Sequence, residues 1–248
     1  MSATPLFRIF ADINNEIMIH YPDSADNVHI IVAAGSGSRY GGNLPKQFCD
    51  LAGRPMLMTT MERLAGATPG ARIIVVLSAD MTGMWEEMCR EHSFTLAHTI
   101  VAGGPSRAHS VKNAVVTLDP ATVGWVSVHD AARPMVTRAM MERLLSALSD
   151  TCRGAIPVVA VTDSLRVLEP DGGSKAVDRS LYRAVQTPQV FDGRTLIEAN
   201  RQELLPTFTD DASVVEAAGL GPLALVEGDT ANIKVTNPGD IERIMLNL

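Results

Sequence analysis

Short apolar runs and longer amphipathic segments alternate along the chain from Val28 onward. The short runs are rich in valine and isoleucine, which is typical of strands buried in a parallel sheet. The predicted strands are 30–32, 72–78, 95–102, 125–128, 155–161 and 223–226. The segments with apolar residues at helical spacing are 55–64, 80–92, 106–118, 138–148 and 195–205, with further helices beginning near 209 and 238. This alternation predicts an α/β fold, in which a Rossmann-like, mostly parallel twisted sheet carries helices on both faces.

One segment, 164–179, breaks the alternation with two short strand-like stretches joined by PDGG at 170–173. These turn residues predict a β-hairpin. The hairpin has few apolar residues with which to form a core, and an isolated hairpin is only marginally stable in water. We therefore expect an arm, about residues 160–183, that packs against the same arm of a second subunit in a homodimer. A hairpin exposed to solvent is the alternative.

The composition sets the broad class of the protein. The chain has 248 residues, of which 46% are hydrophobic, which is enough for the core of one large domain. Residues 1–27 lack the features of a secretory signal, and we expect them to form an appended extension, ordered or disordered, before a domain at 28–248. No apolar stretch approaches the length of a membrane span, so no membrane partner is expected.

Charge and cysteine usage narrow the partners and the compartment. The formal net charge of −7 argues against nucleic acid as a partner, because nucleic-acid binding needs a basic surface. Cys49, Cys89 and Cys152 show no paired spacing, so neither a metal site nor a disulfide framework is indicated. A cytoplasmic location, in a reducing environment, fits this usage best.

The stretch after the first predicted strand carries the clearest chemical signal. Its small residues keep the backbone bare, so that amide groups can approach phosphate oxygens closely. These small residues are Ala33, Ala34, Gly35 and Gly37. Arg39 and Lys46 follow, and their positive charges can offset the negative charges of a triphosphate. The loop therefore predicts a nucleotide site.

Two commoner glycine loops do not fit this stretch. A P-loop needs Ser or Thr after its lysine, whereas Gln47 follows Lys46. A dinucleotide fingerprint needs a third glycine where the chain has Tyr40. The remaining alternative is a plain strand-to-helix turn with surface charges, and the two basic residues favour function over that reading.

Polar motifs also follow two other predicted strands. GGPSRAHS, from Gly103 to Ser110, comes after one of them and opens a helix, whose N-terminus favours an anion. HDAARP follows another strand and places Asp130 at its end, where a carboxylate suits a hydrated magnesium ion that bridges phosphates. A capped turn and a helix cap are the structural alternatives. In a parallel sheet such strand ends meet at one edge, so the motifs point to a common ligand site.

Two later segments carry weaker signals. Thr209, Asp210 and Asp211 begin a helix, and capping alone explains them. Lys234 is expected in a late strand between two apolar neighbours, where its ammonium either reaches water or pairs with an anion.

A series of these segments, in order and covering nearly the whole chain from Val28, resembles the 2-C-methyl-D-erythritol 4-phosphate cytidylyltransferase family of the non-mevalonate isoprenoid pathway. The segments are VAAGSGSR, PKQF, GGPSRAHSV, HDAARP, VDR, QTPQVF, TDDAS and NIKVT. The resemblance implies a homodimeric α/β fold of the nucleotidyltransferase type. It also implies the magnesium-dependent reaction of CTP with methylerythritol 4-phosphate, which gives CDP-methylerythritol and pyrophosphate.

The resemblance also assigns roles to individual residues, by motif match. The catalytic cations would be Arg39, Lys46 and Lys234. The nucleotide-binding residues would be Ala33, Ala34, Gly35, Gly37, Gly103, Gly104, Ser110 and Ala131. The acceptor-binding residues would be Asp130, Arg133, Ser164, Arg179, Thr187 and Thr209, with Ser164 and Arg179 supplied by the partner's arm. Asp130 would also help to seat Mg²⁺.

The chain departs from the family pattern at Ser38, Pro105, Ser164 and Asp211. Serine at 164 keeps the hydroxyl of threonine, and aspartate at 211 keeps the charge of glutamate. Two other functions stay open: a ribitol 5-phosphate cytidylyltransferase, which shares several motifs, and a nucleotide-binding module without turnover. GGPSRAHSV and the HDAARP alanines favour the methylerythritol enzyme, and the presence of both lysines disfavours the module.

Overall fold

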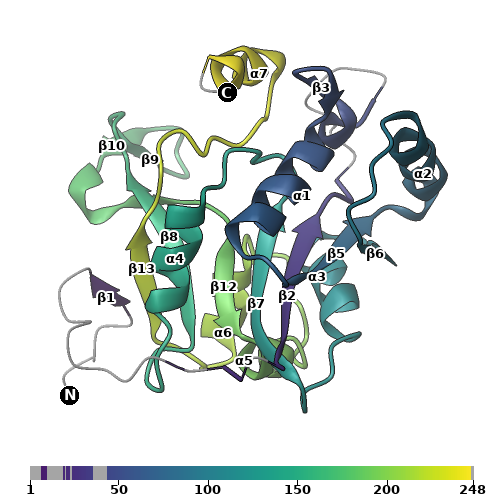
Figure 1. The fold of residues 1–248 in the computed structure, drawn as a ribbon. Coiled ribbons are helices and arrows are strands. Elements are labelled where there is room, and N and C mark those ends of the chain that lie inside the picture. Colours follow the sequence, from purple (N-terminus) through teal and green to yellow (C-terminus); the bar gives the residue numbers. More distant parts are fainter. Residues whose placement is uncertain (1–6, 10–18, 20, 23, 36–43, 247–248) are drawn as a thin grey trace.

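A single sheet, covered by helices on both faces, organises the computed structural model (Figure 1). The structure describes residues 7–9, 19, 21–22, 24–35 and 44–246. Among these residues, no helix is long and apolar enough to cross a membrane.

The main sheet is mostly parallel, as the alternation predicts. Its strand order is β1 (Phe7–Ile9), β13 (Leu223–Glu227), β8 (Gly154–Ala160), β12 (Gln189–Asp192), β7 (Val123–Asp130), β2 (Asp26–Val32), β5 (Arg72–Leu77) and β6 (Thr99–Ala102). β12 runs antiparallel to both of its neighbours, and β11 (Arg183–Val185) pairs antiparallel with the end of β8. The parallel strands β2, β5 and β7 therefore end at the same edge of the sheet.

Helices cover the two faces of the sheet and one end of it (Figure 1). The first face carries α1 (Met56–Ala67), α2 (Thr82–Glu91) and α4 (Arg138–Ser146). The second face carries α3 (Arg107–Val115), α5 (Gly193–Ala199) and α6 (Asp211–Ala217). At the carboxyl end of the parallel strands lie α7 (Pro238–Met245) and a small hairpin, β3 (Asp50–Leu51) with β4 (Arg54–Pro55). Single turns are η2 (Lys46–Phe48), η3 (Ala79–Met81) and η4 (Arg179–Leu181).

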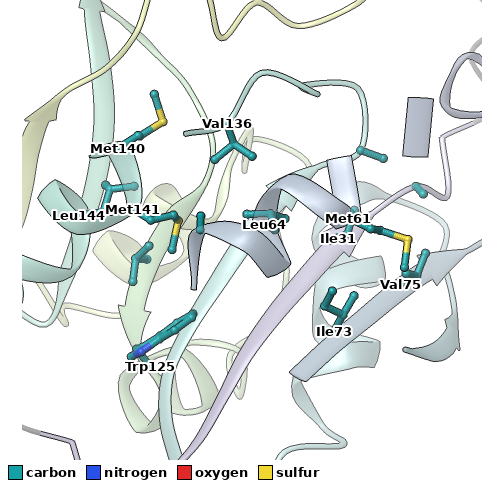
Figure 2. Packing of buried hydrophobic residues seen from close by; sticks show 14 of the residues in the cluster. Ile31, Met61, Leu64, Ile73, Val75, Trp125, Val136, Met140, Met141 and Leu144 are labelled. Atoms are coloured by element: carbon teal, nitrogen blue, oxygen red, sulfur yellow. The ribbon is translucent and has the colours of Figure 1, made fainter. Parts of the chain in front are cut away.

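Alternate residues of each strand enter different cores, because side chains along a strand point to opposite faces. Ile31 of β2 packs under α1 and α4, whereas its neighbour Ile30 packs under α3 and α5. Figure 2 shows the first core, in which Met61 of α1 and Met141 of α4 lie above the sheet. Each such fully buried side chain stabilises the fold by about 1.5–3 kcal/mol. The strand ends that carry the polar motifs are thus held on a rigid base.

The predicted hairpin is confirmed. β9 (Arg166–Leu168) and β10 (Ser174–Ala176) pair antiparallel, and Gly172 adopts φ +84° in the turn between them. The arm exposes apolar side chains, among them Leu168, which is 82% exposed. It projects from the end of β8 (Figure 1).

Three expectations about the C-terminal part are wrong. Lys234 does not lie in a strand: β13 ends at Glu227, and the chain runs on as a loop to α7. In this loop the amide of Val235 donates to the carbonyl of Ala132 rather than to a neighbouring strand. The helix predicted over 195–205 ends at Ala199, and α6 takes Asp210, not Thr209, as its N-cap.

Parts of the predicted N-terminal extension contact the domain. β1 adds a parallel strand to β13, and the amide of Ile19 donates to the carbonyl of Leu148. The hydroxyl of Tyr21 donates to Asp192 at 3.2 Å. The strand β2 begins at Asp26, two residues before the predicted domain boundary.

Candidate active site

A cavity of about 510 Å³ opens at the carboxyl ends of β2 and β7. Its walls come from the loop after β2, the start of α3, the end of β7 and the loop before α7. The lining residues are Val32, Ala33, Ala34, Gly35, Lys46, Gln47, Gly104, Pro105, Ser106, Arg107, Ser110, Asp130, Ala131, Ala132 and Lys234. Most of the residues that the sequence assigns to nucleotide binding therefore meet around one space.

The loop after β2 is held in place by Gln47. This buried side chain donates from Nε2 to the carbonyl of Ala33 at 2.6 Å and to that of Gly35 at 3.1 Å. With these two carbonyls occupied, the orientation of the small-residue loop toward the cavity is fixed. Gly37 and Arg39, which are predicted to contact the nucleotide, lie outside the described residues.

The loop after β6 packs too closely for any side chain at its glycines. A Cβ at position 103 would lie 2.5 Å from Cβ of Ala34, and one at 104 would lie 2.6 Å from Cβ of His109. The amide of Gly104 donates to Oγ of Ser110 at 3.0 Å, and that hydroxyl donates to the carbonyl of Ser106. Two predicted nucleotide-binding residues of this loop, Gly104 and Ser110, are thus hydrogen-bonded to each other. Gly104 lines the cavity, whereas Gly103 packs behind the cavity lining.

Asp130 is surrounded by cations at the end of β7. Lys234 Nζ lies 2.7 Å from Oδ2, Arg107 Nε lies 3.3 Å from Oδ1, and Arg133 Nε lies 3.7 Å from Oδ2. Burial alone would raise the pKa of this carboxyl, but Arg107 and Lys234 outweigh it and hold the pKa well below its usual range. The group is therefore a carboxylate at any pH at which the protein works.

A chain of hydrogen bonds beneath the cavity fixes the backbone of Asp130. Its amide donates to Oγ1 of Thr187, which lies 3.0 Å from Nδ1 of His129. His129 Nε2 is 2.9 Å from the carbonyl of Arg133, which can only accept, so Nε2 carries the hydrogen and Nδ1 accepts from Thr187. Burial lowers the pKa of His129 to about 4, which keeps this neutral tautomer at neutral pH.

The loop that carries Lys234 is anchored at several points. Gln186 donates from Nε2 to the carbonyl of Asp229 and accepts from the amide of that residue. Arg133 donates to the carbonyl of Asn232 at 2.8 Å, and Lys46 donates to the carbonyl of Val235 at 3.0 Å. Both predicted catalytic lysines that the structure describes are therefore held by the same loop at one side of the cavity.

Other predicted acceptor residues lie elsewhere. Thr187 is buried, with its hydroxyl bonded to Asp130 and His129, so in this structure it supports the site from below. Thr209, Ser164 and Arg179 are exposed and are not among the residues that line the cavity of their own chain. The guanidinium of Arg179 donates to the carbonyl of Thr162 within the arm.

Sequence reasoning missed several residues that shape the site. Arg107 joins Asp130 to Asp211, and Gln47 holds the nucleotide loop. Gln189 accepts from the amides of Asp211 and Ala212 and so fastens the start of α6 to β12. The available signal was the presence of these glutamines in PKQF and QTPQVF, but which backbone groups a glutamine bonds depends on the tertiary structure.

The residues present fit a metal ion that arrives with a ligand better than a resident one. Among the described residues, no group of three or more His, Cys, Asp or Glu side chains could hold a metal. Asp130 offers one carboxylate beside several cations. Magnesium commonly takes one or two protein carboxylates and completes its shell with water and substrate phosphates, which a single Asp130 satisfies.

Comparison with known proteins places this geometry in a family. Residues 28–246 match the family model described as 2-C-methyl-D-erythritol 4-phosphate cytidylyltransferase. A relative of that name from Bacteroides thetaiotaomicron is 45% identical over 213 residues, which is 86% of this chain and 95% of the relative. The enzyme of that name from Dechloromonas aromatica is 39% identical over 217 residues, 86% of this chain and 92% of the relative.

Solved structures agree with these sequence matches. The crystal structure of 2-C-methyl-D-erythritol 4-phosphate cytidylyltransferase from Thermus thermophilus is 30% identical, with a TM-score of 0.68 over 88% of this chain and 96% of that one. The Francisella tularensis structure of the same name is 28% identical, with a TM-score of 0.72 over 90% of this chain and all of that one (100%).

The packing behind the cavity makes a prediction about Gly103. Gly103→Ala should weaken CTP binding at least about tenfold, because the new Cβ must push Ala34 and its loop into the cavity. Gly66→Ala in α1 is the matched control, since a Cβ there meets nothing within 4 Å and alanine favours a helix. Titration calorimetry with CTP measures both. Unchanged affinity in a folded Gly103→Ala protein would mean that the nucleotide does not use this wall.

Proposed function

Because the chain belongs to the 2-C-methyl-D-erythritol 4-phosphate cytidylyltransferase family, we propose that the cavity at the ends of β2 and β7 is its active site. The chain transfers CMP from CTP to 2-C-methyl-D-erythritol 4-phosphate, giving 4-diphosphocytidyl-2-C-methyl-D-erythritol and pyrophosphate. The observation that carries the assignment of the site is the convergence of the bare loops and of Lys46, Lys234 and Asp130 on one space.

CTP would enter with its base against the loop after β6 and its phosphates along the loop after β2. The wall at Gly103 and Gly104 is formed by backbone and by Ser110, so it can hydrogen-bond the edge of a pyrimidine. A purine is larger and would collide with this close-packed wall. The triphosphate would then lie near Lys46 and Lys234, at the other side of the cavity.

The reaction is an in-line substitution at the α-phosphorus of CTP. An oxygen of the acceptor phosphate forms the new O–P bond as the bond to pyrophosphate breaks, and the electron pair of that bond leaves with pyrophosphate. The acceptor phosphate is already ionised at neutral pH, so no general base is needed. The protein must instead bring two polyanions together and stabilise charge as it moves toward the leaving group.

Fixed positive charge meets that requirement. Lys46 and Lys234 are held by one loop, and Lys234 reaches both Asp130 and the cavity. Preorganised cations of this kind act strongly because they need no reorganisation during the reaction. Arg39 would add a third cation from the segment outside the described residues. Asp130 and Arg133 would face the acceptor, with the carboxylate placed to accept from its hydroxyls.

Magnesium would arrive with CTP and be seated beside Asp130. When bound, it would neutralise negative charge on the phosphates of the leaving group. Asp130 would supply a carboxylate oxygen while its neighbours stay close, since Lys234 lies 2.7 Å from Oδ2 and Arg107 lies 3.3 Å from Oδ1. The phosphates themselves provide the anion toward which Lys234 can turn.

The acceptor phosphate would be bound by a second copy of the chain. Arg179 and Ser164 are exposed on the arm and do not line their own cavity. The arm and the adjoining segment expose apolar side chains, including Leu168 at 82% and Leu181 at 80%, which a homodimer would cover. The arm would therefore carry Arg179, a fork suited to phosphate, into the neighbouring site.

The remaining partners follow from composition. A net charge of −7 supports the absence of a nucleic-acid partner. Three cysteines without paired spacing support a cytoplasmic location.

The function is tested by measuring pyrophosphate release from CTP with three acceptor conditions. We expect rapid release with methylerythritol 4-phosphate, and at least about a hundredfold lower kcat/KM with ribitol 5-phosphate, because a pocket that hydrogen-bonds one set of hydroxyls rejects another. Release without acceptor should be negligible. Preference for ribitol 5-phosphate would assign the acceptor to the alternative enzyme, and no release with either would indicate a binding module.

The two lysines should act mainly in the transition state. Lys46→Ala and Lys234→Ala should each lower kcat by roughly 10²–10³, with a smaller effect on the KM for CTP, because negative charge shifts as pyrophosphate leaves. Lys112→Ala is the matched control, since this lysine of α3 bonds the carbonyl of Gln202 and does not line the cavity. Steady-state kinetics decide, and near-normal turnover in a folded variant removes that lysine from catalysis.

Subunit mixing tests the shared site. Arg179→Ala should mainly raise the KM for the acceptor phosphate, and mixing it with Lys46→Ala should restore activity. In the mixed dimer one site has an intact Lys46 and receives an intact Arg179 from its partner. Each variant mixed with itself is the control, and differently tagged chains verify exchange. Exchange without recovery would show that the arm serves its own chain.

A further inference from the structure

Arg107 contacts the end of β7 and the start of α6 from the first turn of α3, beside the cavity. It is the first residue of α3, directly after the loop that follows β6, and its side chain lines the cavity. Nε donates to Oδ1 of Asp130 at 3.3 Å, and Nη2 lies 2.8 Å from Oδ2 of Asp211 at the start of α6. A single guanidinium thus spans two carboxylates that lie far apart in the sequence.

Among the described residues, the ion-pair partner of Asp211 is Arg107. The Asp211 side chain is 3% exposed, and its Oδ2 accepts no hydrogen bond of good geometry. Burial raises the pKa of this carboxyl, and the neighbouring Arg107 opposes that rise. Helix capping does not need this side chain, because Asp210 is the N-cap and accepts from the amide of Ser213. A buried carboxylate that neither caps its helix nor faces solvent is costly to keep. Its role must therefore lie in what it does to Arg107.

We propose that Arg107 is a positioning residue that holds Asp130 in place during the reaction, and that Asp211 anchors Arg107 for this purpose. The inference rests on the proposed roles of Asp130 and Lys234. In the structure, Lys234 makes the shortest contact to Asp130, and the α-phosphate would give its ammonium a second anion to bind. A carboxylate whose main partner is shared with a second anion needs another partner that is not shared.

Arg107 is the cation best placed to stay. The third cation, Arg133, lies 3.7 Å from Asp130, and its guanidinium donates instead to the carbonyl of Asn232. Arg107 has its Nε hydrogen-bonded to Oδ1, opposite the oxygen that Lys234 occupies. The Asp211 anchor prevents Arg107 from following the phosphates into the cavity.

A double-mutant cycle tests this role. Arg107→Met and Asp211→Asn should each lower kcat/KM for the acceptor about tenfold or more, and the double variant should be no worse than Arg107→Met, because Asp211 acts only through Arg107. The Kd for CTP, measured without acceptor, should change less than about threefold in Asp211→Asn. Asp211→Glu should keep kcat/KM within about threefold of the parent value, since glutamate keeps the negative charge that asparagine removes.

Controls separate this role from a loss of stability. Asp26→Asn breaks the 2.6 Å ion pair with Arg72 near the amino ends of β2 and β5, so it should lower thermal stability without changing the kinetics. Arg107→Lys, which keeps the charge but not the fork, serves if Asp211→Asn does not fold, and it should show the same loss of kcat/KM.

Asp130→Asn identifies the source of any failure. If Asp130→Asn is impaired while Asp211→Asn and Arg107→Lys are normal, the positioning role is overturned and the proposed site stands. If Asp130→Asn is itself normal, the role of Asp130 in the proposed site fails and the inference fails with it. Additive losses in the cycle would show that Asp211 acts independently of Arg107 and would overturn the anchoring role. Weakened CTP binding in Arg107→Met alone would make Arg107 a nucleotide contact rather than a positioning residue.

Discussion

A carboxylate kept ionised at the end of a buried strand is the constraint around which this site is built. Asp130 ends β7, whose residues are all buried, and burial of an unpaired charge would cost several kcal/mol. The fold offsets that cost by directing Lys234 and two arginines at one group. Those cations come from a late loop, from the start of α3 and from the turn after β7, so segments far apart in the sequence must meet before the charge is tolerated. The requirement that keeps Asp130 ionised is the same one that gathers positive charge beside the cavity proposed to bind the triphosphate.

Amide side chains and a neutral histidine hold that arrangement together from below. Gln47, Gln186 and Gln189 each bond the backbone of a different loop, and the first fixes the nucleotide loop while the others fix the Lys234 loop and α6. Such groups are suited to the task because they donate and accept without adding charge. His129 must stay neutral for its Nδ1 to accept from Thr187, and its burial ensures that it does. The electrostatics of the cavity therefore depend on uncharged hydrogen bonds that fix the surrounding backbone.

The features that the sequence predicts correctly are those that depend on the local pattern of apolar and polar residues. Apolar runs and helical periodicity place the strands, and glycine-rich strand ends place the ligand edge, because both depend on neighbours in the chain. The apolar neighbours of Lys234 predict a strand, but Val235 lies in the loop before α7, where it is buried beside Met135 and its amide donates to the carbonyl of Ala132. The ion pair between Arg107 and Asp211 cannot be predicted from local pattern, because it joins residues more than a hundred positions apart in the sequence. Sequence motifs indicate candidate residues, and only the tertiary structure shows which of them contact one another.

Within one chain, the arm does not line the cavity that Lys234 lines. The cavity gathers the residues suited to a nucleotide, whereas Arg179 and Ser164 stay exposed on a hairpin that pairs only with itself among the described residues. A hairpin of three-residue strands with exposed leucines gains little from its own burial. Its length and its exposed apolar side chains make sense if a second copy covers it, and that copy would then complete the acceptor side. In such an arrangement, dimer formation and acceptor recognition draw on the same segment, so neither could be lost without weakening the other.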